Sequence, residues 1–180
     1  MNKHFVVFDL ETTELDILVA EPVQIYLATG TPEGGLRDEL VIHTYGNRPI
    51  QPGAEAVHGL SLAHLKKIGM AAPVATGRVL DYFWKHQPLC LLGHNALSFD
   101  FPILQNWLQR YGQGRFRHAP CCEIYDTMHL CCAHFQTKKW FKLAAAATAL
   151  EIEVPEGLHD AKVDGRLTWE VFKKLKEGCR

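Results

Sequence analysis

Two carboxylates stand two residues apart near the N-terminus, at the end of a short apolar run. Asp9 and Glu11 belong to or directly follow the segment His4–Leu10, whose continuous apolar character predicts a strand buried on both faces. Residues two apart on a strand point to the same face, so these two side chains should project together. Like charges raise each other's pKa unless a cation neutralises them, and a hard divalent cation suits such oxygen ligands. The alternative interpretation is a pair of solvent-exposed acids at a strand end.

Two further carboxylates stand in otherwise apolar helix faces. Asp100 falls near the start of a helix predicted over about 98–111, and Asp164 in the last predicted helix, which ends near 177. The residues that share a face with Asp100 are Leu104, Trp107 and Leu108, and those that share a face with Asp164 are Leu167, Val171 and Leu175. A charge in such a row is costly unless it is paired or bound to a metal. Simpler alternatives are an anion at a helix N-terminus for Asp100 and a buried salt bridge for Asp164.

A histidine precedes the last of these carboxylates by five residues. On one helix, an offset of five residues turns the chain by about 140°, so His159 and Asp164 would not share a face. His159 therefore has to lie on the loop that enters the helix if it is to reach the same site. A single loop histidine is common in proteins, so its interest comes from the four carboxylates near it.

Strand-like and helix-like segments alternate along the chain and would position these groups. The predicted strands are His4–Leu10, Pro22–Thr29, Glu39–Tyr45, Leu89–Gly93 and Pro120–Tyr125, of which the first three form a meander. Five helices are predicted. Two are capped, one by Ser98 and ending at Tyr111 and one by Asp126 and ending at His134; the others are Ala72–His86, Phe141–Leu150 and a last helix from Asp160 or Ala161 to Glu177. The stretch Pro52–Ile68 is turn-like and then weakly helical, with Ser61 as an N-cap. The order predicts an α/β fold in a single domain spanning 1–180, with a mixed sheet of about five strands flanked by helices.

Composition and charge limit the functional classes. The 180 residues carry a formal net charge of −1, so no strong global field steers a polyanion to this protein, and a nucleic acid would need local basic patches and bound cations. We find neither a signal peptide nor an apolar run long enough to span a bilayer, which predicts a cytoplasmic protein without a membrane partner. The adjacent pairs Cys121-Cys122 and Cys131-Cys132 lack the usual zinc spacing and are interpreted as small buried side chains.

Three strings that contain the candidate site residues resemble a known family. FDLETTELD, HNALSFD and HDAKVD resemble, in order and spacing, the three exonuclease motifs of the DEDDh superfamily, which includes the epsilon proofreading subunit of DNA polymerase III, exonuclease X and RNase T. The resemblance covers about residues 4–175 and implies an RNase H-like fold. It assigns Asp9 and Glu11 to the first motif, Asp100 to the second, and His159 and Asp164 to the third. PGAEAVHGL, around His58, is similar to a smaller motif of the family.

The resemblance implies a metal-dependent 3′–5′ exonuclease that uses two Mg²⁺ or Mn²⁺ ions. Asp9 would bridge both ions, Glu11 and Asp164 would hold the ion that binds the attacking water, Asp100 would support the other, and His159 would be the general base. Single-stranded DNA ends, in repair or proofreading, are the expected substrate, and RNA ends are the alternative. A polymerase or repair partner stays open. A non-catalytic nucleic-acid-binding module of the same fold is a different possibility; the loss of an acidic ligand or the histidine would mark it, and all five residues are present.

The same resemblance suggests contacts to the substrate. Candidate binding residues are Thr12, Thr13, Leu15, His58 and Asn95, and His94 is expected to support the site structurally. Glu14 replaces the family's usual Gly, so it either adds repulsion beside the phosphate path or points away from it. The segment Lys138–Lys142, with Arg110, Arg115 and Arg117, could line a single-strand path through charge and stacking. A solvated helix entrance is the alternative.

Overall fold

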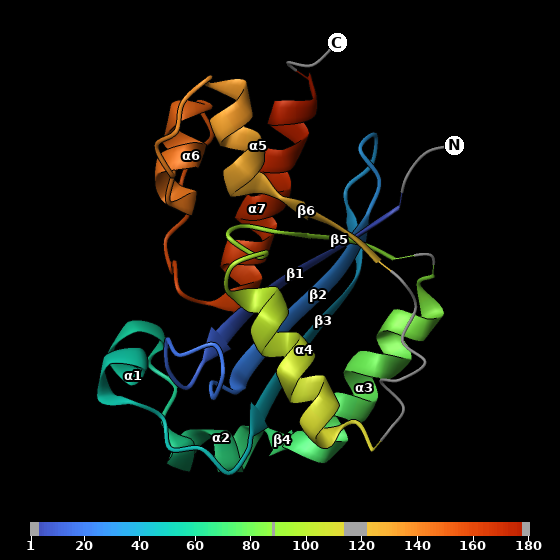
Figure 1. Ribbon diagram of the computed structural model, residues 1–180, viewed down its shortest axis with the longest axis vertical. Helices are drawn as coiled ribbons and strands as arrows, with labels where there is room; N and C mark the ends of the chain where they lie inside the picture. The colour runs from blue at the N-terminus through green and yellow to red at the C-terminus, as the bar shows by residue number, and fades with distance from the viewer. Residues whose placement is uncertain (1–3, 88, 114–121, 178–180) are drawn as a thin grey trace.

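A six-stranded mixed sheet forms the centre of the molecule, with helices on both faces (Figure 1). The computed structural model describes residues 4–87, 89–113 and 122–177. The strands lie in the order β4-β3-β2-β1-β5-β6, so the strand that carries the first acidic pair is central. No helix among the described residues combines the length and the apolar character needed to cross a membrane.

The sheet combines an antiparallel meander with parallel strands. Its strands are β1 (Phe5–Thr12), β2 (Pro22–Gly30), β3 (Leu36–Tyr45), β4 (Met70–Ala71), β5 (Leu89–Gly93) and β6 (Cys122–Asp126). β1, β2 and β3 pair antiparallel, whereas β5 runs parallel to β1, β6 parallel to β5, and β4 parallel to β3. The mixed α/β sheet expected from the sequence is confirmed. The sixth strand, β4, has only two residues, which is too short to leave a periodic pattern in the sequence.

Seven helices are described, and most follow their predicted ranges. They are α1 (Pro52–His58), α2 (Leu62–Ile68), α3 (Ala72–Lys85), α4 (Asp100–Tyr111), α5 (Thr127–His134), α6 (Leu143–Ala149) and α7 (Ala161–Glu177). The caps predicted at Ser61 and Asp126 are confirmed, because each side chain accepts a hydrogen bond from a first-turn N–H. The cap predicted at Ser98 is wrong. The backbone N–H of Ser98 bonds to the Asn95 carbonyl in a turn before the helix, and Phe99 occupies the N-cap position without a side-chain cap.

Alternate residues of β1 pack against opposite layers. Val6, Phe8 and Leu10 face the cluster formed with α3 and α4, whereas Phe5 and Val7 belong to the clusters on the α7 side. Because side chains alternate along a strand, Asp9 and Glu11 continue the row of Phe5 and Val7. The acidic pair therefore points to the face that α7 covers.

Close packing fixes α7 on the sheet. Gly165 lies against the Tyr26 ring of β2, where a Cβ atom would collide with the aromatic carbons, and Gly30 lies against the Trp169 indole, 2.7 Å from where its own Cβ would stand. The Arg166 guanidinium binds the Glu39 carboxylate through two hydrogen bonds of 2.7 and 2.9 Å, and Glu39 also accepts one from the Tyr26 hydroxyl. These contacts set how closely the first turn of α7 approaches β1 and β2.

Replacing Gly165 with alanine should destabilise the fold, although alanine is the better helix former. An ordinary helical Gly→Ala change stabilises by about 0.5–1 kcal/mol. Here the added methyl group meets Tyr26, so overpacking should lower the free energy of unfolding by about 1–3 kcal/mol. Urea denaturation of Gly165→Ala measures this, and Gly35→Ala, where the methyl enters open space, is the control. A Gly165→Ala protein as stable as the wild type would contradict the close-packing account.

Candidate active site

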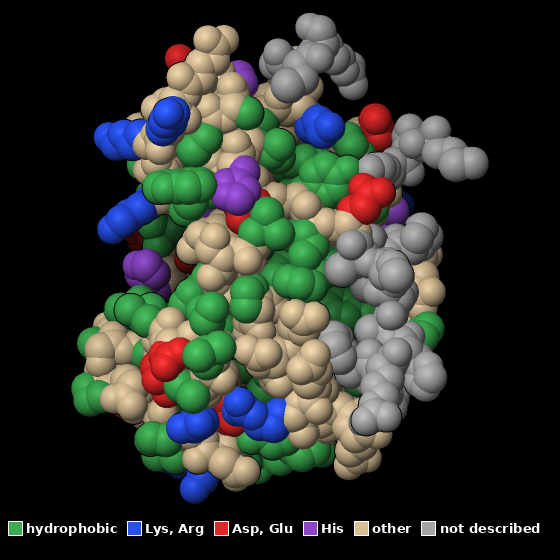
Figure 2. All heavy atoms as spheres, in the orientation of Figure 1, with side chains coloured by type: hydrophobic (Ala, Val, Ile, Leu, Met, Phe, Trp, Pro, Cys, Tyr) green, Lys and Arg blue, Asp and Glu red, His purple; other side chains and the backbone are tan. Residues whose placement is uncertain are grey.

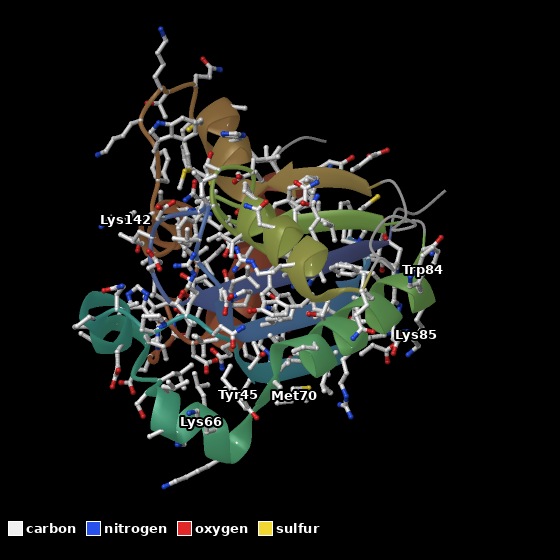
Figure 3. The ribbon with its side chains drawn as sticks, turned by 60° about the horizontal axis from the view of Figure 1, so that its bottom comes forward. Tyr45, Lys66, Met70, Trp84, Lys85 and Lys142 are labelled. Carbon is white, nitrogen blue, oxygen red and sulfur yellow. The ribbon has the colours of Figure 1, made fainter. Side chains whose placement is uncertain are left out.

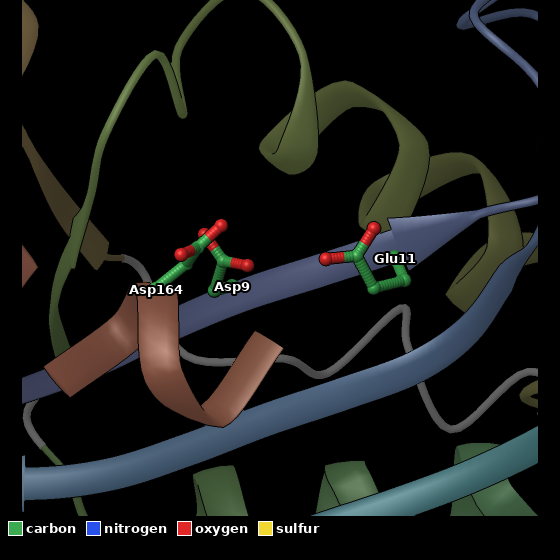
Figure 4. A group of neighbouring side chains, drawn as sticks. All are labelled: Asp9, Glu11 and Asp164. Carbon is green, nitrogen blue, oxygen red and sulfur yellow. The ribbon is translucent and has the colours of Figure 1, made fainter. Parts of the chain in front are cut away.

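Three carboxylates from two elements converge beside the central strand. Asp9 and Glu11 come from β1 and Asp164 from the first turn of α7, and one oxygen atom of each lies within 4.8 Å of the others (Figure 4). This spacing is close enough for all three to bind one cation, and carboxylate oxygens are the ligands that hard divalent cations prefer. The structure thus brings together three of the four carboxylates predicted as ligands.

The fourth carboxylate, Asp100, lies just outside this cluster. It is the first residue of α4, its residue is 6% exposed, and it shares the buried face of Leu104 and Trp107 as the sequence predicted. Burial raises the pKa of its carboxyl group well above the ordinary value, and the nearby backbone of Asp100 and Leu10 lowers it in part. Asp100 is one of the charges that raise the pKa of Asp9, so it acts on the cluster electrostatically without being part of the closest trio.

Burial and mutual repulsion favour protonation of these groups. Burial first, and then the charges of Asp100, Asp164 and Glu11, raise the pKa of Asp9 well above its ordinary value. Burial and the charge of Asp164 raise the pKa of Glu11 to about 8. The largest electrostatic contributions come from other carboxylates, so the protein itself does not balance this charge. Protons or cations have to do so.

One ligand atom in the cluster has no protein partner. The Oδ1 atom of Asp164 is buried and receives no hydrogen bond from any residue that the structure describes. A buried carboxylate oxygen without a partner is costly, unless a ligand supplies the missing interaction. The unpaired oxygen and the clustered charges together fit a bound divalent cation.

His159 lies immediately before α7, as the five-residue offset required. Its backbone is left-handed, with φ of 70°, and its N–H donates a 3.2 Å hydrogen bond to Oδ2 of Asp164. This bond and the proximity of the imidazole lower the pKa of Asp164, against the larger raising effect of burial. The side chain itself is exposed. The strained turn therefore holds an accessible imidazole within electrostatic reach of the carboxylates.

A polar pair that sequence reasoning missed holds this loop to the sheet. The Gln24 amide of β2 donates a 2.8 Å hydrogen bond to Oδ2 of Asp160 and accepts one of 2.9 Å from the Ala161 N–H. The other oxygen of Asp160 accepts from the first-turn N–H groups of Lys162 and Val163, which confirms Asp160 as the helix cap. Gln24 is a buried polar residue in an otherwise apolar strand, and that interruption of the pattern was the available signal.

An apolar cavity of about 470 Å³ opens beside Glu11. Three of the predicted substrate contacts line it, namely Thr12, Leu15 and His58. Leu10, Val57 and Phe99 contribute apolar walls, and Gln51, Gly53 and Ala54 complete the side formed by α1 and the residue before it. Glu14 also lines the cavity, so it stands beside the predicted substrate path rather than away from it.

The other predicted contacts lie elsewhere. Thr13 is buried, and its hydroxyl accepts a 3.0 Å hydrogen bond from the Glu21 N–H while its N–H binds the Glu21 carbonyl, so it holds two segments together. Asn95 adopts a left-handed backbone, and its N–H binds Asp126, which places it in the turn after β5. His94 makes ring hydrogen bonds to Thr127 and to the Phe141 carbonyl, in agreement with the expected structural role.

The basic and cysteine predictions have mixed outcomes. Arg110 forms a 2.7 Å salt bridge with the buried Glu21, so its guanidinium has a partner within the fold, and its contact with nucleic acid stays a prediction. Arg115, Arg117 and Cys121 lie outside the described residues. Cys131 is buried, as interpreted from the sequence, and burial raises the pKa of its thiol to about 11, whereas Cys132 is only half-buried.

Removing one carboxylate should change how stability depends on pH in the metal-free protein. The folded-state pKa of Glu11, about 8, exceeds its ordinary value of 4.5, so the associated stability is present below that ordinary value and is lost as the pH rises through the folded pKa. In EDTA, the free energy of unfolding of the wild type should therefore fall as the pH rises from 4.5 to about 8. In urea denaturation, Glu11→Gln should show a smaller fall over the same pH range. Glu33→Gln, an exposed acid in a turn, is the control. Identical pH profiles for Glu11→Gln and the wild type would contradict the electrostatic account.

Divalent cations should stabilise the fold through the same cluster. Millimolar Mn²⁺ should raise the wild-type melting temperature, because binding only to the folded state shifts the unfolding equilibrium. Asp164→Asn should lose most of this increase, whereas Glu33→Gln should keep it. A melting curve of the wild type that does not respond to Mn²⁺ or Mg²⁺ would rule out a cation site here.

Comparison with known proteins agrees with this geometry. A family model described as Exonuclease matches residues 6–172. Three prime repair exonuclease 2 from Mus musculus is 30% identical over 89% of this chain and 78% of its own length, and the Homo sapiens protein is 32% identical over 69% of this chain and 60% of its own length. DNA polymerase III PolC-type from Halalkalibacterium halodurans is 25% identical over 98% of this chain, which spans 12% of that protein.

The fold has counterparts among solved structures. Exonuclease I superposes with a TM-score of 0.82 and 20% identity, covering 97% of this chain and 41% of the exonuclease I chain. The E. coli enzyme in complex with a dT13 oligonucleotide superposes with a TM-score of 0.81 over the same share of both chains. The match of the family model spans all three acidic motifs and nearly the whole chain. The chain therefore belongs to the exonuclease family, within the DEDDh-type 3′–5′ exonuclease superfamily.

Proposed function

We propose that this exonuclease removes nucleoside monophosphates one at a time from the 3′ ends of single-stranded DNA, using two Mg²⁺ or Mn²⁺ ions. The observation that carries the proposal is the convergence of Asp9, Glu11 and Asp164 within 4.8 Å, beside a cavity of nucleoside size. The acidic cluster supports a site for phosphodiester hydrolysis, and the cavity supports a site that grips the end of a strand.

The chain offers the ligands that two ions would need. Asp9 interacts electrostatically with the other three carboxylates and would be shared between the ions. Glu11 and Asp164 would complete one site, and Asp100 would support the other. When bound, such ions activate a water molecule and stabilise charge on the attacking and leaving oxygens. The unpaired Oδ1 of Asp164 and the raised pKa values of Asp9 and Glu11 support this donor set.

His159 is proposed to take the proton from the attacking water. A histidine side chain changes its charge near neutral pH, which suits a general base. Its imidazole is exposed and lies within electrostatic reach of Asp164, while its backbone N–H is bound to the same carboxylate. The hydrogen bond fixes where the loop lies, and the ring nitrogens make no hydrogen bond to any residue that the structure describes, so they can face the water.

The cavity is proposed to hold the 3′-terminal nucleoside. Leu15, Val57 and Phe99 supply apolar surface for a base, and Thr12 and His58 supply polar atoms near the sugar. The Leu15 side chain is strongly exposed, at 82%, so it is accessible to a ligand in the cavity. Glu14 also lines the cavity, and an acidic residue there would disfavour a phosphate and favour the uncharged part of the nucleotide.

The choice of DNA rests on similar proteins. The name of three prime repair exonuclease 2 indicates repair at 3′ ends, and E. coli exonuclease I forms complexes with dT13 and dA16 oligonucleotides. We extend this substrate class and a role in DNA repair or proofreading to the present chain. Shortening of RNA in place of DNA would overturn the choice of DNA as substrate.

Activity assays should show metal-dependent shortening from the 3′ end. Single-stranded DNA and RNA labelled at the 5′ end should be incubated with Mg²⁺, Mn²⁺ or EDTA, and the DNA should give a ladder of shorter products only with metal. Asp9→Ala should reduce the rate by at least about 10³-fold and His159→Ala by about 10²–10⁴-fold, as expected for a lost general base. Glu33→Gln should be fully active. Rapid cleavage of RNA with intact DNA would assign the protein to RNA, and no cleavage of either would overturn the proposal.

Trimming the cavity wall should weaken substrate binding without disturbing the fold. Leu15→Ala should raise KM for a short oligonucleotide by about 5- to 20-fold, a range set by the loss of one leucine's apolar contact. Leu18→Ala is the matched control, because Leu18 is similarly exposed, at 71%, but does not line the cavity. Equal KM values for Leu15→Ala and Leu18→Ala would show that the terminal nucleoside lies elsewhere.

A further inference from the structure

The segment that leads into α6 lies at the same sheet edge as the acidic cluster. His94 directly follows β5, which runs parallel to β1 in the register Val7 with Leu92, so His94 is next to Asp9 across the two strands. Its Nε2 atom donates a 2.8 Å hydrogen bond to the Phe141 carbonyl. This bond ties residues 137–142 to the loop that carries the second acidic motif.

An aromatic side chain on this segment is open to solvent. The Trp140 indole is 60% exposed, and its neighbour is the His129 imidazole of α5, with ring centroids 5.1 Å apart and a tilt of 45°. Leu97, in the loop between β5 and α4, is also exposed, at 41%. Tryptophan buries a large area when it packs, so an exposed tryptophan beside a site is a candidate for contact with a ligand.

The surroundings of Trp140 are basic, in a chain whose net charge is −1. Residues 127–150 contain no Asp or Glu, and Lys138, Lys139 and Lys142 are exposed within them. None of these lysines forms a salt bridge with a residue that the structure describes. Lysine and arginine side chains gather over the segment that leads into α6 (Figure 2). The exposed aromatic ring and the unpaired lysines complement a strand with stacking bases and a phosphate backbone.

The cavity and the segment that leads into α6 lie on different sides of the start of α7 (Figure 1). α1, which lines the cavity, and the segment leading into α6 are at opposite ends of the edge where β1 terminates (Figure 1). A strand whose last nucleoside occupies the cavity would place its scissile phosphate at the acidic cluster. Its preceding nucleotides would then run towards Trp140.

We propose that Trp140, beside His129 and flanked by Lys138, Lys139 and Lys142, is a stacking platform for nucleotides upstream of the scissile phosphate. The inference rests on the proposed function, because it requires the 3′-terminal nucleoside to bind in the cavity. The platform gives the enzyme a preference for longer single strands. It does not affect chemistry on the terminal nucleotide.

Tryptophan fluorescence tests the platform without turnover. Trp107 and Trp169 are buried, whereas Trp84 is 41% exposed on α3, and Lys142 and Trp84 lie on opposite sides of the molecule (Figure 3). Oligothymidylate titrated in Ca²⁺ should quench the fluorescence of the wild type and of the matched control Trp84→Ala. Trp140→Ala should lose most of the quenching and bind about tenfold more weakly, the size expected for one stacked base. Unchanged quenching and affinity in Trp140→Ala would overturn the platform.

Kinetics separate the platform from the catalytic site. Trp140→Ala should lower kcat/KM about tenfold for a long oligothymidylate. The same variant should hydrolyse the p-nitrophenyl ester of thymidine monophosphate at a rate within about twofold of the wild type. Trp140→Phe should keep most of the activity on the oligonucleotide, because its ring can still stack. An equal loss on both substrates would indicate a structural role and overturn the proposal, as would no loss on either. If the wild type hydrolyses neither substrate, the proposed function fails, and the fluorescence titration still decides whether Trp140 binds single strands.

Discussion

Repulsion between buried carboxylates is the constraint on which the rest of this structure depends. Asp9, Glu11 and Asp164 converge within 4.8 Å, and Asp100 adds its charge from the start of α4. Such an arrangement opposes folding unless protons or cations occupy it, because burial and like charge both disfavour ionisation. The surrounding protein must therefore be rigid enough to hold the four groups against their mutual repulsion. The central position of β1, the packing of α7 and the helix start at Asp100 all meet that requirement.

The site and the surfaces around it would make different contacts with a bound strand. We propose that the carboxylates and His159 act on one phosphodiester, that the apolar cavity beside Glu11 accepts the uncharged part of a nucleotide, and that the basic segment before α6 contacts the nucleotides upstream. The cluster is acidic and the segment before α6 is basic, but the chain as a whole carries a net charge of only −1. Nucleic acid is attracted locally, through bound cations and a few lysines, rather than by a global field.

The sequence predicted those parts of the fold and site that local patterns determine. The strand carrying Asp9 and Glu11, the apolar helix faces around Asp100 and Asp164, and the caps at Ser61, Asp126 and Asp160 depend on residues a few positions apart. The cap at Ser98 was predicted wrongly because a local turn from Asn95 delays the start of α4. The other features that the sequence did not predict involve partners far away in the chain. Arg110 pairs with Glu21, Thr13 holds Glu21, and β4 exists only because two residues meet the end of β3. Such pairings follow from tertiary contacts that no local window contains.

The acidic site is built on two elements, β1 and α7. Asp100 lies close enough to β1 for the Leu10 backbone to lower its pKa in part, so its position depends on the strand that carries Asp9 and Glu11. His159 is bound to Asp164 and the preceding loop is locked by Asp160, so the proposed base and one ligand move together with α7. The distance between β1 and α7 is then the principal adjustable coordinate of the site, and the contacts of Gly165 and Gly30 set it. In the proposed reaction, metal affinity and the position of His159 would therefore be tuned together, by residues that touch neither the metal nor the substrate.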